Sequence, residues 1–400
     1  MKILVVNSGS SSIKFQLIEM PGESTLCEGL VERIGLEDPV FHYSTGKGRI
    51  REKMAIPNHR EGLYKMAEAL FHPLKGVIGN RNEIVAVGHR VVHGGDSFSS
   101  TGKVTEQVKQ EIARFIPLAP LHNPHNLEGI NIAEEVFPDA VQVAVFDTAF
   151  HQTMPLRARK YAIPDYLFRE HGIKAYGFHG ISHKYVAEKA IEHLGTKHQK
   201  IITVHLGNGC SMTAVKNGKS IDHSLGFAPS NGLIMGSRSG DIDHSLIFYL
   251  SDRLGYSLEK IQNMLTRESG MLGLTGFADL RDIQAKAASG DETCQLALEM
   301  NVYRIKKYIG AYTAAMNGLD ALVFTAGIGE NSSLIRKMAC DQMDWLGIVL
   351  DSQKNETTSR GLRELQGKTS KVVVLVIPTN EELEIAKQTY QLVTGSSHHQ

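Results

Sequence analysis

The sequence predicts an α/β protein made of two related domains around a central cleft. The first observation is that short apolar runs rich in β-branched residues alternate with helix-length stretches along the 400 residues. This alternation is typical of sheets covered by helices. The runs are Ile3–Val6, Ile84–Val87, Val141–Phe146, Ile201–Leu206, Ala321–Phe324 and Val372–Ile377. The second observation is a repeat, because VVNSGSSSIKF at residues 5–15 returns as VHLGNGCSMTAV at residues 204–215.

The position of the repeat predicts the domain organisation. Each copy reads as a strand, a short polar turn and a second strand, and each lies near the start of one half of the chain. We expect an N-terminal domain over residues 1–150 and a C-terminal domain over residues 151–380. The last helix, within residues 381–400, should pack back on the first domain. Because no low-complexity linker separates the halves, we expect a hinge between them and not a tether.

The composition argues against several classes of protein. Lysine plus arginine equals aspartate plus glutamate at 43 each, so no overall field would draw the chain to nucleic acid or to anionic lipid. No apolar run approaches the ~20 residues of a membrane span. The four cysteines lie far apart without a C-x-x-C pair, which argues against a disulfide framework or a zinc ribbon. We therefore expect a cytoplasmic protein.

The repeated turn is suited to binding phosphate. Glycine lets the backbone approach a ligand closely, and successive N–H groups and hydroxyls converge on an anion, to which Lys14 adds a point charge. A polar turn without a ligand explains one copy equally well. A third glycine-rich stretch, residues 327–331, follows the strand-like run Ala321–Phe324, and nucleotides bind at the carboxyl ends of such strands. Together the three stretches favour a phosphate site, although neither a Walker A loop nor G-x-G-x-x-G occurs.

Two arginines stand among small residues. Arg90 lies in GHRVVHGG and Arg238 in MGSRSGDID. A guanidinium in such surroundings can reach a carboxylate or a phosphate with its planar fork. The alternative for each is an interface salt bridge.

Histidines and strand-end carboxylates complete the candidate site. His179 and His183 have zinc-like spacing, but Gly180 stands where H-E-x-x-H requires a glutamate. Imidazoles that hydrogen-bond a substrate oxyanion fit the pattern better. Asp147 directly follows the apolar run Val141–Phe146. Glu381 comes shortly after the apolar run Val372–Ile377, where a helix is expected to begin. Such oxygen ligands suit Mg²⁺, although acids in a first helical turn also complement the helix dipole.

These segments, taken together, closely resemble the acetate kinase family of short-chain carboxylate kinases. The resemblance is colinear from about residue 3 to residue 386. It is carried by NSGSSSIKF, GHRVVHGG, APLHNPHN, FDTAFH, YGFHGISHKYV, HLGNGCS, MGSRSGDID, TAGIGENS and PTNEE. It implies the two-domain fold of sugar kinases, heat-shock chaperone ATPases and actin, assembled as a homodimer. It also implies reversible, direct in-line transfer of the γ-phosphoryl group of ATP to acetate, giving acetyl phosphate and ADP, with Mg²⁺ or Mn²⁺.

The resemblance also assigns roles to residues. Arg90 would hold the carboxylate, and Asp147 would act as a proton shuttle or as a positioning group. His179 and Arg238 would stabilise the transferring phosphoryl group, while Asn7 and Glu381 would hold the metal. The other implied positions fall in three groups: Val92, His122, Phe178 and Pro229 line the acyl site; Lys14, His205, Leu206, Gly207, Asn208 and Gly209 meet the phosphates; Asp279, Leu280, Arg281, Gly327, Ile328, Gly329, Glu330 and Asn331 meet the nucleoside.

The chain departs from the family pattern at two places. Residues 222–233 read DHSLGFAPSNGL where the family commonly has DTSMGFTPLEGL, and the changes flank Pro229. Leu280, in FADLRD, replaces an aromatic residue of the family's SSDFRD. The first departure concerns the preference for the acyl chain, and the second concerns discrimination between bases.

Two other functions remain open from the sequence. A propionate or butyrate kinase is one, because a single methylene in an apolar pocket is worth only about 1–3 kcal/mol. A nucleotide-binding switch module that phosphorylates no metabolite is the other, although it gives no reason for both isolated arginines. For the kinase we expect nucleotide binding to swing the two halves together, because phosphate groups must be clamped and water excluded.

Overall fold

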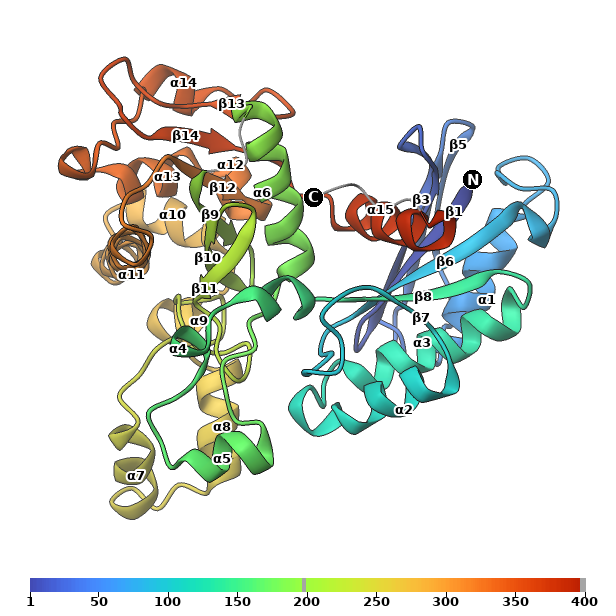
Figure 1. Cartoon of the computed structure of the whole chain (residues 1–400), viewed down its shortest axis with the longest axis horizontal. Coiled ribbons are helices and arrows are strands. Elements are labelled where there is room, and N and C mark those ends of the chain that lie inside the picture. The colour runs from blue at the N-terminus through green and yellow to red at the C-terminus, as the bar shows by residue number, and fades with distance from the viewer. Residues whose placement is uncertain (196–198, 396–400) are drawn as a thin grey trace. The chain divides into compact units, whose positions relative to one another are not determined.

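The computed structural model describes residues 1–195 and 199–395 of the chain. The chain divides into two compact units, which are shown in Figure 1. Unit 1 consists of Met1–Gln152 with the segment that begins at Asn380, and unit 2 consists of Thr153–Thr379. Within the described residues, no helix is both long and apolar enough to cross a membrane.

Unit 1 is built on an eight-stranded sheet with the order β5-β4-β3-β2-β1-β6-β8-β7. Strands β1, β6 and β8 are parallel, and β1 to β5 form an antiparallel meander. The strands are β1 Lys2–Ser8, β2 Ser12–Glu19, β3 Ser24–Glu32, β4 Val40–Thr45, β5 Gly48–Lys53, β6 Ile84–Val91, β7 Gly102–Lys103 and β8 Val141–Phe146. The helices are α1 His59–Leu70, α2 Glu106–Arg114, α3 Asn123–Val136 and α15 Glu381–Thr394, with short 3₁₀ turns at Arg81–Glu83, Ile116–Leu118 and Ala149–Thr153.

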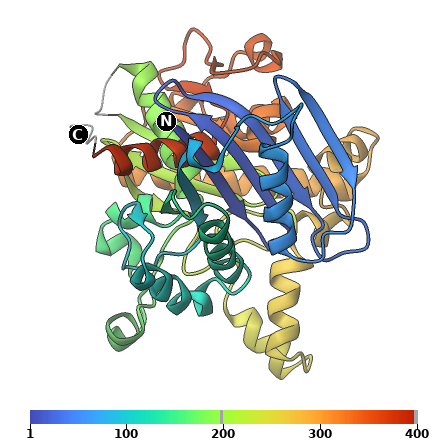
Figure 2. The same ribbon diagram turned by 90° about the vertical axis from the view of Figure 1, so that its right-hand side faces the viewer.

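Successive side chains along the parallel strands point to opposite faces of the sheet, and each face is covered by its own layer of helices. Leu4 and Val87 join the core formed with α1 and α3. Gly88 lies on the opposite face of the sheet. A β-carbon added to it would lie 2.8 Å from Ile385 of α15. Helix α15 therefore covers the face opposite α1 and α3 (Figure 1). In Figure 2, α1 lies in front of the blue strands of this sheet.

Unit 2 repeats this arrangement. Its six-stranded sheet has the order β11-β10-β9-β12-β14-β13, so antiparallel β11-β10-β9 followed by parallel β9-β12-β14 matches β3-β2-β1 and β1-β6-β8 of unit 1. The strands are β9 Lys200–Leu206, β10 Cys210–Lys216, β11 Lys219–His223, β12 Ala321–Thr325, β13 Arg363–Glu364 and β14 Val373–Val376. The prediction of two duplicated α/β units is confirmed.

The helices of unit 2 include one long helix, α11 Glu292–Met316, and many short ones. The others are α4 Leu156–Arg159, α5 Asp165–His171, α6 Gly180–Leu194, α7 Ser245–Asp252, α8 Leu258–Arg267, α9 Gly270–Thr275, α10 Leu280–Ala288, α12 Ala326–Asn331, α13 Ser333–Cys340 and α14 Ser352–Glu356, with a 3₁₀ turn at Asp344–Leu346. The residues between β1 and β2, and those between β9 and β10, form the two tight turns of the sequence repeat. Each turn lies at the carboxyl end of a parallel strand, which is the edge that binds ligands in α/β proteins.

Candidate active site

The site residues of unit 1 gather at the carboxyl edge of its parallel strands. Arg90 lies near the end of β6, and Asp147 directly follows the neighbouring strand β8. The backbone N–H of Asp147 donates to the carbonyl of Val91 over 3.0 Å, which continues the ladder between the two strands. Asp147 is therefore held by the sheet itself, beside the guanidinium of Arg90.

The Arg90–Asp147 pair is close and largely buried. Arg90 Nε and Nη2 both donate to Asp147 Oδ2, over 3.1 and 2.6 Å. The Asp147 side chain is 1% exposed and the Arg90 side chain is 21% exposed. Asp147 Oδ1 is also buried but has no hydrogen-bond partner among the described residues. The second oxygen is thus an unsatisfied acceptor, the kind of buried polar atom that is rare unless a ligand or ion completes it.

The electrostatics of the pair follow from burial. Burial raises the pKa of Asp147 above its usual value, and the adjacent Arg90 opposes this effect. For Arg90, burial acts to lower the pKa, but Asp147 and Glu381 outweigh it and keep the guanidinium charged. Glu381 Oε2 lies 3.9 Å from Arg90 Nε. The edge of the sheet thus carries one fixed cation between two carboxylates.

Asn7 and Lys14 stand on the same edge of unit 1, directly opposite each other in the pairing of β1 with β2. Alternation along β1 places Asn7 on the face that α15 covers, because Leu4 and Val6 belong to the core with α1 and α3. Lys14 Nζ lies 2.7 Å from Glu382 Oε1 in the first turn of α15. With a half-exposed lysine this ion pair is weak and exchangeable, so the lysine remains able to meet an anion.

Sequence reasoning missed two asparagines that position this edge. Asn126 Nδ2 donates to the Ser8 carbonyl over 2.7 Å, and Asn126 Oδ1 accepts from the N–H of Val92 over 3.0 Å. Asn123 Oδ1 accepts from the N–H of His93. Both side chains are buried and fix the chain segments that leave β1 and β6. The signal in the sequence is the pair of asparagines in HNPHN.

In unit 2, the predicted residues His179 and Arg238 approach the turn between β9 and β10. A β-carbon placed on Gly209 would lie 3.5 Å from His179 Nε2 and 3.6 Å from Arg238 Nη1. Arg238 Nη1 donates to the Pro229 carbonyl over 2.7 Å. Burial lowers the pKa of Arg238, with Cys210 acting in the opposite direction. In the described part of the chain no carboxylate pairs with this guanidinium, so an anion is the natural missing partner.

The histidines of unit 2 are oriented by hydroxyl groups. His179 Nδ1 lies 2.9 Å from Ser211 Oγ, and His183 Nε2 lies 2.7 Å from the same oxygen. His183 Nδ1 is 2.7 Å from Thr203 Oγ1. Because both ring nitrogens of His183 are used by hydroxyls, the His179–His183 pair does not form a metal site here. His179 has φ +55°, a left-handed conformation that is uncommon outside glycine and often marks functional sites.

A cavity of about 530 Å³ opens beside this turn in unit 2, a size typical of small-molecule sites. Several segments far apart in the sequence line it. The predicted residues among the lining are Leu206, Gly207, Asn208, Asp279, Leu280, Arg281, Gly327, Ile328 and Asn331. Sequence reasoning missed others, among them Met271 and Asn301, which carry no motif. The cavity therefore brings the predicted phosphate turn and the predicted nucleoside residues together.

Other predicted residues of unit 2 lie outside the lining of this cavity. His205 is buried, and its Nδ1 lies 2.9 Å from Ser182 Oγ. Gly329 packs close to β9, because a β-carbon added to it would lie 3.6 Å from the carbonyl oxygen of Val204. Glu330 Oε1 accepts from the N–H of Thr379.

The predicted acyl site is divided between the two units. Val92 and His122 belong to unit 1, whereas Phe178 and Pro229 belong to unit 2. The grouping of these four residues therefore stays a prediction.

The fold and these residues define a class of protein. Two α/β units with the same strand order, each with a tight polar turn at the carboxyl edge, are the architecture of the sugar-kinase and actin-like ATPases. Arg90 and Arg238, which are both partly exposed, and the cavity beside one turn are suited to binding phosphate and nucleotide.

The comparisons with known proteins identify the family. The model of the Acetokinase family matches residues 2–387, and the chain belongs to this family. It is 58% identical over 393 residues to the acetate kinase of Flavobacterium johnsoniae, covering 98% of this chain and 100% of that one. It is 50% identical over 398 residues to the acetate kinase of Thermotoga maritima, covering 98% and 99%.

Solved structures agree with this assignment. The crystal structure of Porphyromonas gingivalis acetate kinase matches with a TM-score of 0.93 at 43% identity, covering 98% of this chain and 99% of that one. A propionate kinase from Francisella tularensis matches with a TM-score of 0.92, also at 43% identity and with the same coverage. The predictions of family, fold and kinase activity are confirmed, with ATP and ADP as the co-substrates that the family implies.

Proposed function

We propose that the protein is an acetate kinase, which reversibly transfers the γ-phosphoryl group of ATP to acetate and gives acetyl phosphate and ADP. The observation that carries this proposal is the likeness to acetate kinases over essentially the full length of both chains, at up to 58% identity. The Arg90–Asp147 pair supplies the chemistry expected at the acceptor side, and the cavity of unit 2 supplies the donor side.

The reaction needs alignment and charge neutralisation more than it needs a strong base. Acetate is ionised at neutral pH, so its oxygen can attack the γ-phosphorus while the bond to the β,γ-bridging oxygen breaks and ADP leaves. In this proposal Arg90 orients the acetate carboxylate. His179 Nε2 and Arg238, together with the Gly209 turn, neutralise the equatorial oxygens of the transferring group. Asp147 holds Arg90 in place through Oδ2.

The residues at the edge of unit 1 fit a hard cation. Mg²⁺ prefers oxygen ligands and keeps several of its waters. Asn7 and Glu381 offer an amide and a carboxylate oxygen on the face covered by α15, and Asp147 Oδ1 is a buried acceptor with no partner. We propose that Asn7 and Glu381 hold Mg²⁺, with Mn²⁺ as the alternative, directly or through water. When bound, the ion would supply charge neutralisation on the phosphate oxygens.

The nucleotide would lie in the cavity of unit 2. Leu206, Gly207 and Asn208 would meet the phosphates, and Asp279 to Arg281 with Gly327 and Ile328 would meet the nucleoside. Asp279 accepts from Arg281 Nη2 over 2.5 Å, and this contact lowers the pKa of Asp279 to about 2. The Arg281 side chain is 89% exposed, so it can reorient when the nucleotide arrives.

An assay with hydroxylamine tests the proposal directly. The protein is incubated with Mg-ATP and acetate, propionate or butyrate, and the acyl phosphate is trapped as a hydroxamate. We expect the fastest formation with acetate. A clear preference for propionate would favour the second candidate, a propionate kinase. The likeness to a solved propionate kinase at 43% identity is the observation that favours this candidate. No hydroxamate with any acid would instead support a nucleotide-binding switch.

We also propose that the protein is a homodimer. The segment around α7 and α8 in unit 2 exposes several large apolar side chains at once. These are Leu246, Phe248, Tyr249, Leu254 and Leu258, with exposures of 47, 62, 57, 52 and 71%. Contiguous exposed apolar side chains of this size are typical of interfaces. Light scattering should give twice the mass of one chain, and Phe248→Glu should shift it toward the monomer; a wild-type monomer would contradict the proposal.

A further inference from the structure

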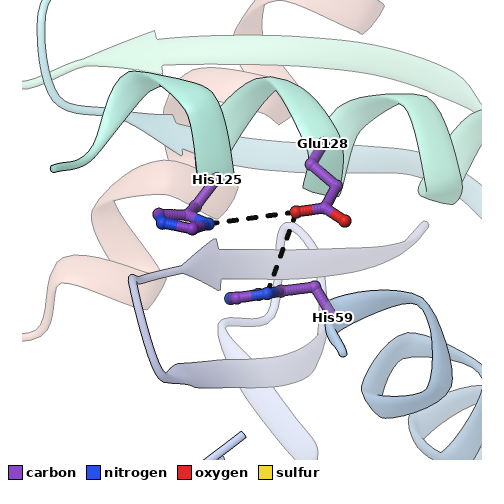
Figure 3. Close-up of side chains that lie close together, drawn as sticks. All are labelled: His59, His125 and Glu128. Carbon is purple, nitrogen blue, oxygen red and sulfur yellow. Dashed lines mark ion pairs between the residues drawn. The ribbon is translucent and has the colours of Figure 1, made fainter. Parts of the chain in front are cut away.

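Three side chains of unit 1 that play no part in the proposed kinase reaction converge at one point. His59 is the first residue of α1, and His125 and Glu128 lie in α3. One potential ligand atom from each lies within 4.8 Å of the other two. Figure 3 shows a carboxylate oxygen of Glu128 directed between the two imidazole rings.

The secondary structure explains how α3 supplies two of the three groups. His125 and Glu128 are three residues apart, so they lie on the same face of the helix. Glu128 Oε2 lies 3.9 Å from His125 Nδ1 and 3.8 Å from His59 Nδ1. The rings of His59 and His125 stack with centroids 4.8 Å apart. Helices α1 and α3 pack against each other, which brings His59 to this face although it is distant in the sequence.

The hydrogen bonding of His59 leaves its Nδ1 available as a ligand. His59 Nε2 lies 2.6 Å from the carbonyl oxygen of Gly9. A carbonyl can only accept, so Nε2 carries the proton, and the neutral ring has its lone pair on Nδ1. An imidazole that donates its other N–H to a backbone carbonyl is the usual arrangement around a metal-binding histidine, because it fixes the tautomer and the ring orientation.

The second imidazole is also in a ligand-ready state. His125 Nδ1 is buried and, within the part of the chain that the structure describes, has no hydrogen-bond partner; at 3.9 Å the Glu128 oxygen is beyond hydrogen-bonding distance. A buried ring nitrogen without a hydrogen-bond partner would gain a partner in a metal ion, which binds the neutral imidazole.

From this geometry we propose that His59, His125 and Glu128 form a binding site for a transition-metal ion of the Zn²⁺ class. Two imidazoles and one carboxylate are a frequent ligand set of zinc, whereas Mg²⁺ and Ca²⁺ require oxygen ligands. A tetrahedral ion with bonds of about 2.0–2.1 Å holds its ligands about 3.3 Å apart. The Glu128 side chain is 44% exposed, so it can rotate to close the remaining gap and leaves room for water as a fourth ligand.

The site would connect three parts of unit 1. An ion would join α1 to α3, and through His59 it would reach the carbonyl of Gly9 in the turn between β1 and β2. Its effect would therefore be to restrain that turn. No other residue is required for this coupling, and the inference does not depend on the identity of the acid that the kinase uses.

The test is metal binding to the purified full-length chain, stripped with a chelator and measured in excess Mg²⁺. The variant H398A/H399A serves as the background, because His398 and His399 are adjacent and could bind metal on their own. We expect one equivalent of Zn²⁺ by titration calorimetry. Co²⁺ should give the visible absorption of a low-symmetry, nitrogen-ligated site.

Variants of the three residues decide the assignment. Because loss of an outer-shell partner alone costs about 10–100-fold in affinity, His125→Ala and Glu128→Gln should each weaken Zn²⁺ binding by at least that factor. The matched control is His42→Gln, which removes a histidine that lies 2.9 Å from Glu32 elsewhere in unit 1 and should leave binding unchanged. Equal binding by the His125→Ala variant, or no Zn²⁺ binding tighter than about 100 μM in the background chain, would overturn the proposal.

Discussion

The two units share a strand order but provide their site arginines with different partners. In unit 1, Arg90 donates twice to the buried carboxylate of Asp147. In unit 2, Arg238 donates to the Pro229 carbonyl, and no described carboxylate pairs with it. Arg90 is therefore compensated before any ligand arrives, whereas the charge of Arg238 is compensated only when an anion binds. The same residue type should thus contribute to both stability and activity in unit 1, but mainly to activity in unit 2.

Substitution of Arg90 by alanine should have the largest effect. It removes the group proposed to hold the acid and leaves Asp147 as a buried, unpaired carboxylate. We expect turnover to fall by about 10²–10⁴-fold and the free energy of unfolding to fall by about 3 kcal/mol. Steady-state kinetics and urea denaturation measure the two effects, and affinity for ADP should stay nearly unchanged.

The double variant Arg90→Ala/Asp147→Ala is the control for this prediction. It should regain part of the lost stability without regaining turnover, because the unpaired charge is gone but the acid is still not held. If ADP affinity fell as much as turnover, the assignment of Arg90 to the acceptor side would be wrong.

Substitution of Arg238 by alanine tests whether the arginine of unit 2, unlike Arg90 of unit 1, contributes to activity without contributing to stability. Turnover should again fall by about 10²–10⁴-fold, but the free energy of unfolding should change by less than about 1 kcal/mol, because removing a partly buried cation without a counter-ion leaves no orphaned charge. Thermal and urea denaturation of the two arginine variants side by side test this. A loss of stability as large as that of Arg90→Ala would remove the distinction between the units.

A partly buried acid of unit 2 gives a smaller, pH-dependent effect. Asp222 Oδ1 accepts from the N–H of His223, and burial raises the pKa of Asp222 to about 6, against the effect of that hydrogen bond. Because the folded state binds this proton more tightly than the unfolded state, stability should fall as the pH rises from about 4 to about 6. Asp222→Asn should remove this loss and stabilise the protein by about 2–3 kcal/mol above pH 6.

The control for Asp222 is Asp252→Asn, an exposed aspartate at the end of α7. It should leave the dependence of the free energy of unfolding on pH unchanged. A parallel curve for wild type and Asp222→Asn between pH 4 and 7 would show that Asp222 is not buried as described.

The smallest effect concerns the nucleoside part of the cavity. Leu280 is 8% exposed and lines this cavity. Leu280→Phe restores the aromatic residue of the family pattern, and a ring stacked on a base is worth about 1 kcal/mol. We expect the KM for ATP to fall several-fold while kcat stays within about twofold. The exposed Leu296→Phe on α11 is the matched control and should leave the KM for ATP unchanged, and an unchanged KM for ATP in Leu280→Phe would contradict the role given to Leu280.

Much of the fold could be predicted from local patterns. Each apolar run in the sequence overlaps a strand, and the repeated hairpins are the β1–β2 and β9–β10 pairs. Backbone periodicity and turn chemistry depend on neighbouring residues, so they are visible without three-dimensional information. For the same reason the short motifs around Arg90 and Arg238 pointed to phosphate and carboxylate chemistry, and their family resemblance followed.

Only the tertiary structure decided which partners these residues have. The unpaired Oδ1 of Asp147, the use of both His183 nitrogens by hydroxyls, and the approach of His59 to His125 and Glu128 depend on strand register and helix packing. Hydrogen bonds and ion pairs act over a few ångströms between residues that are far apart in the chain. The sequence pattern can therefore indicate which side chains are reactive. Only tertiary packing determines whether a given side chain contacts a carboxylate, a hydroxyl or a ligand.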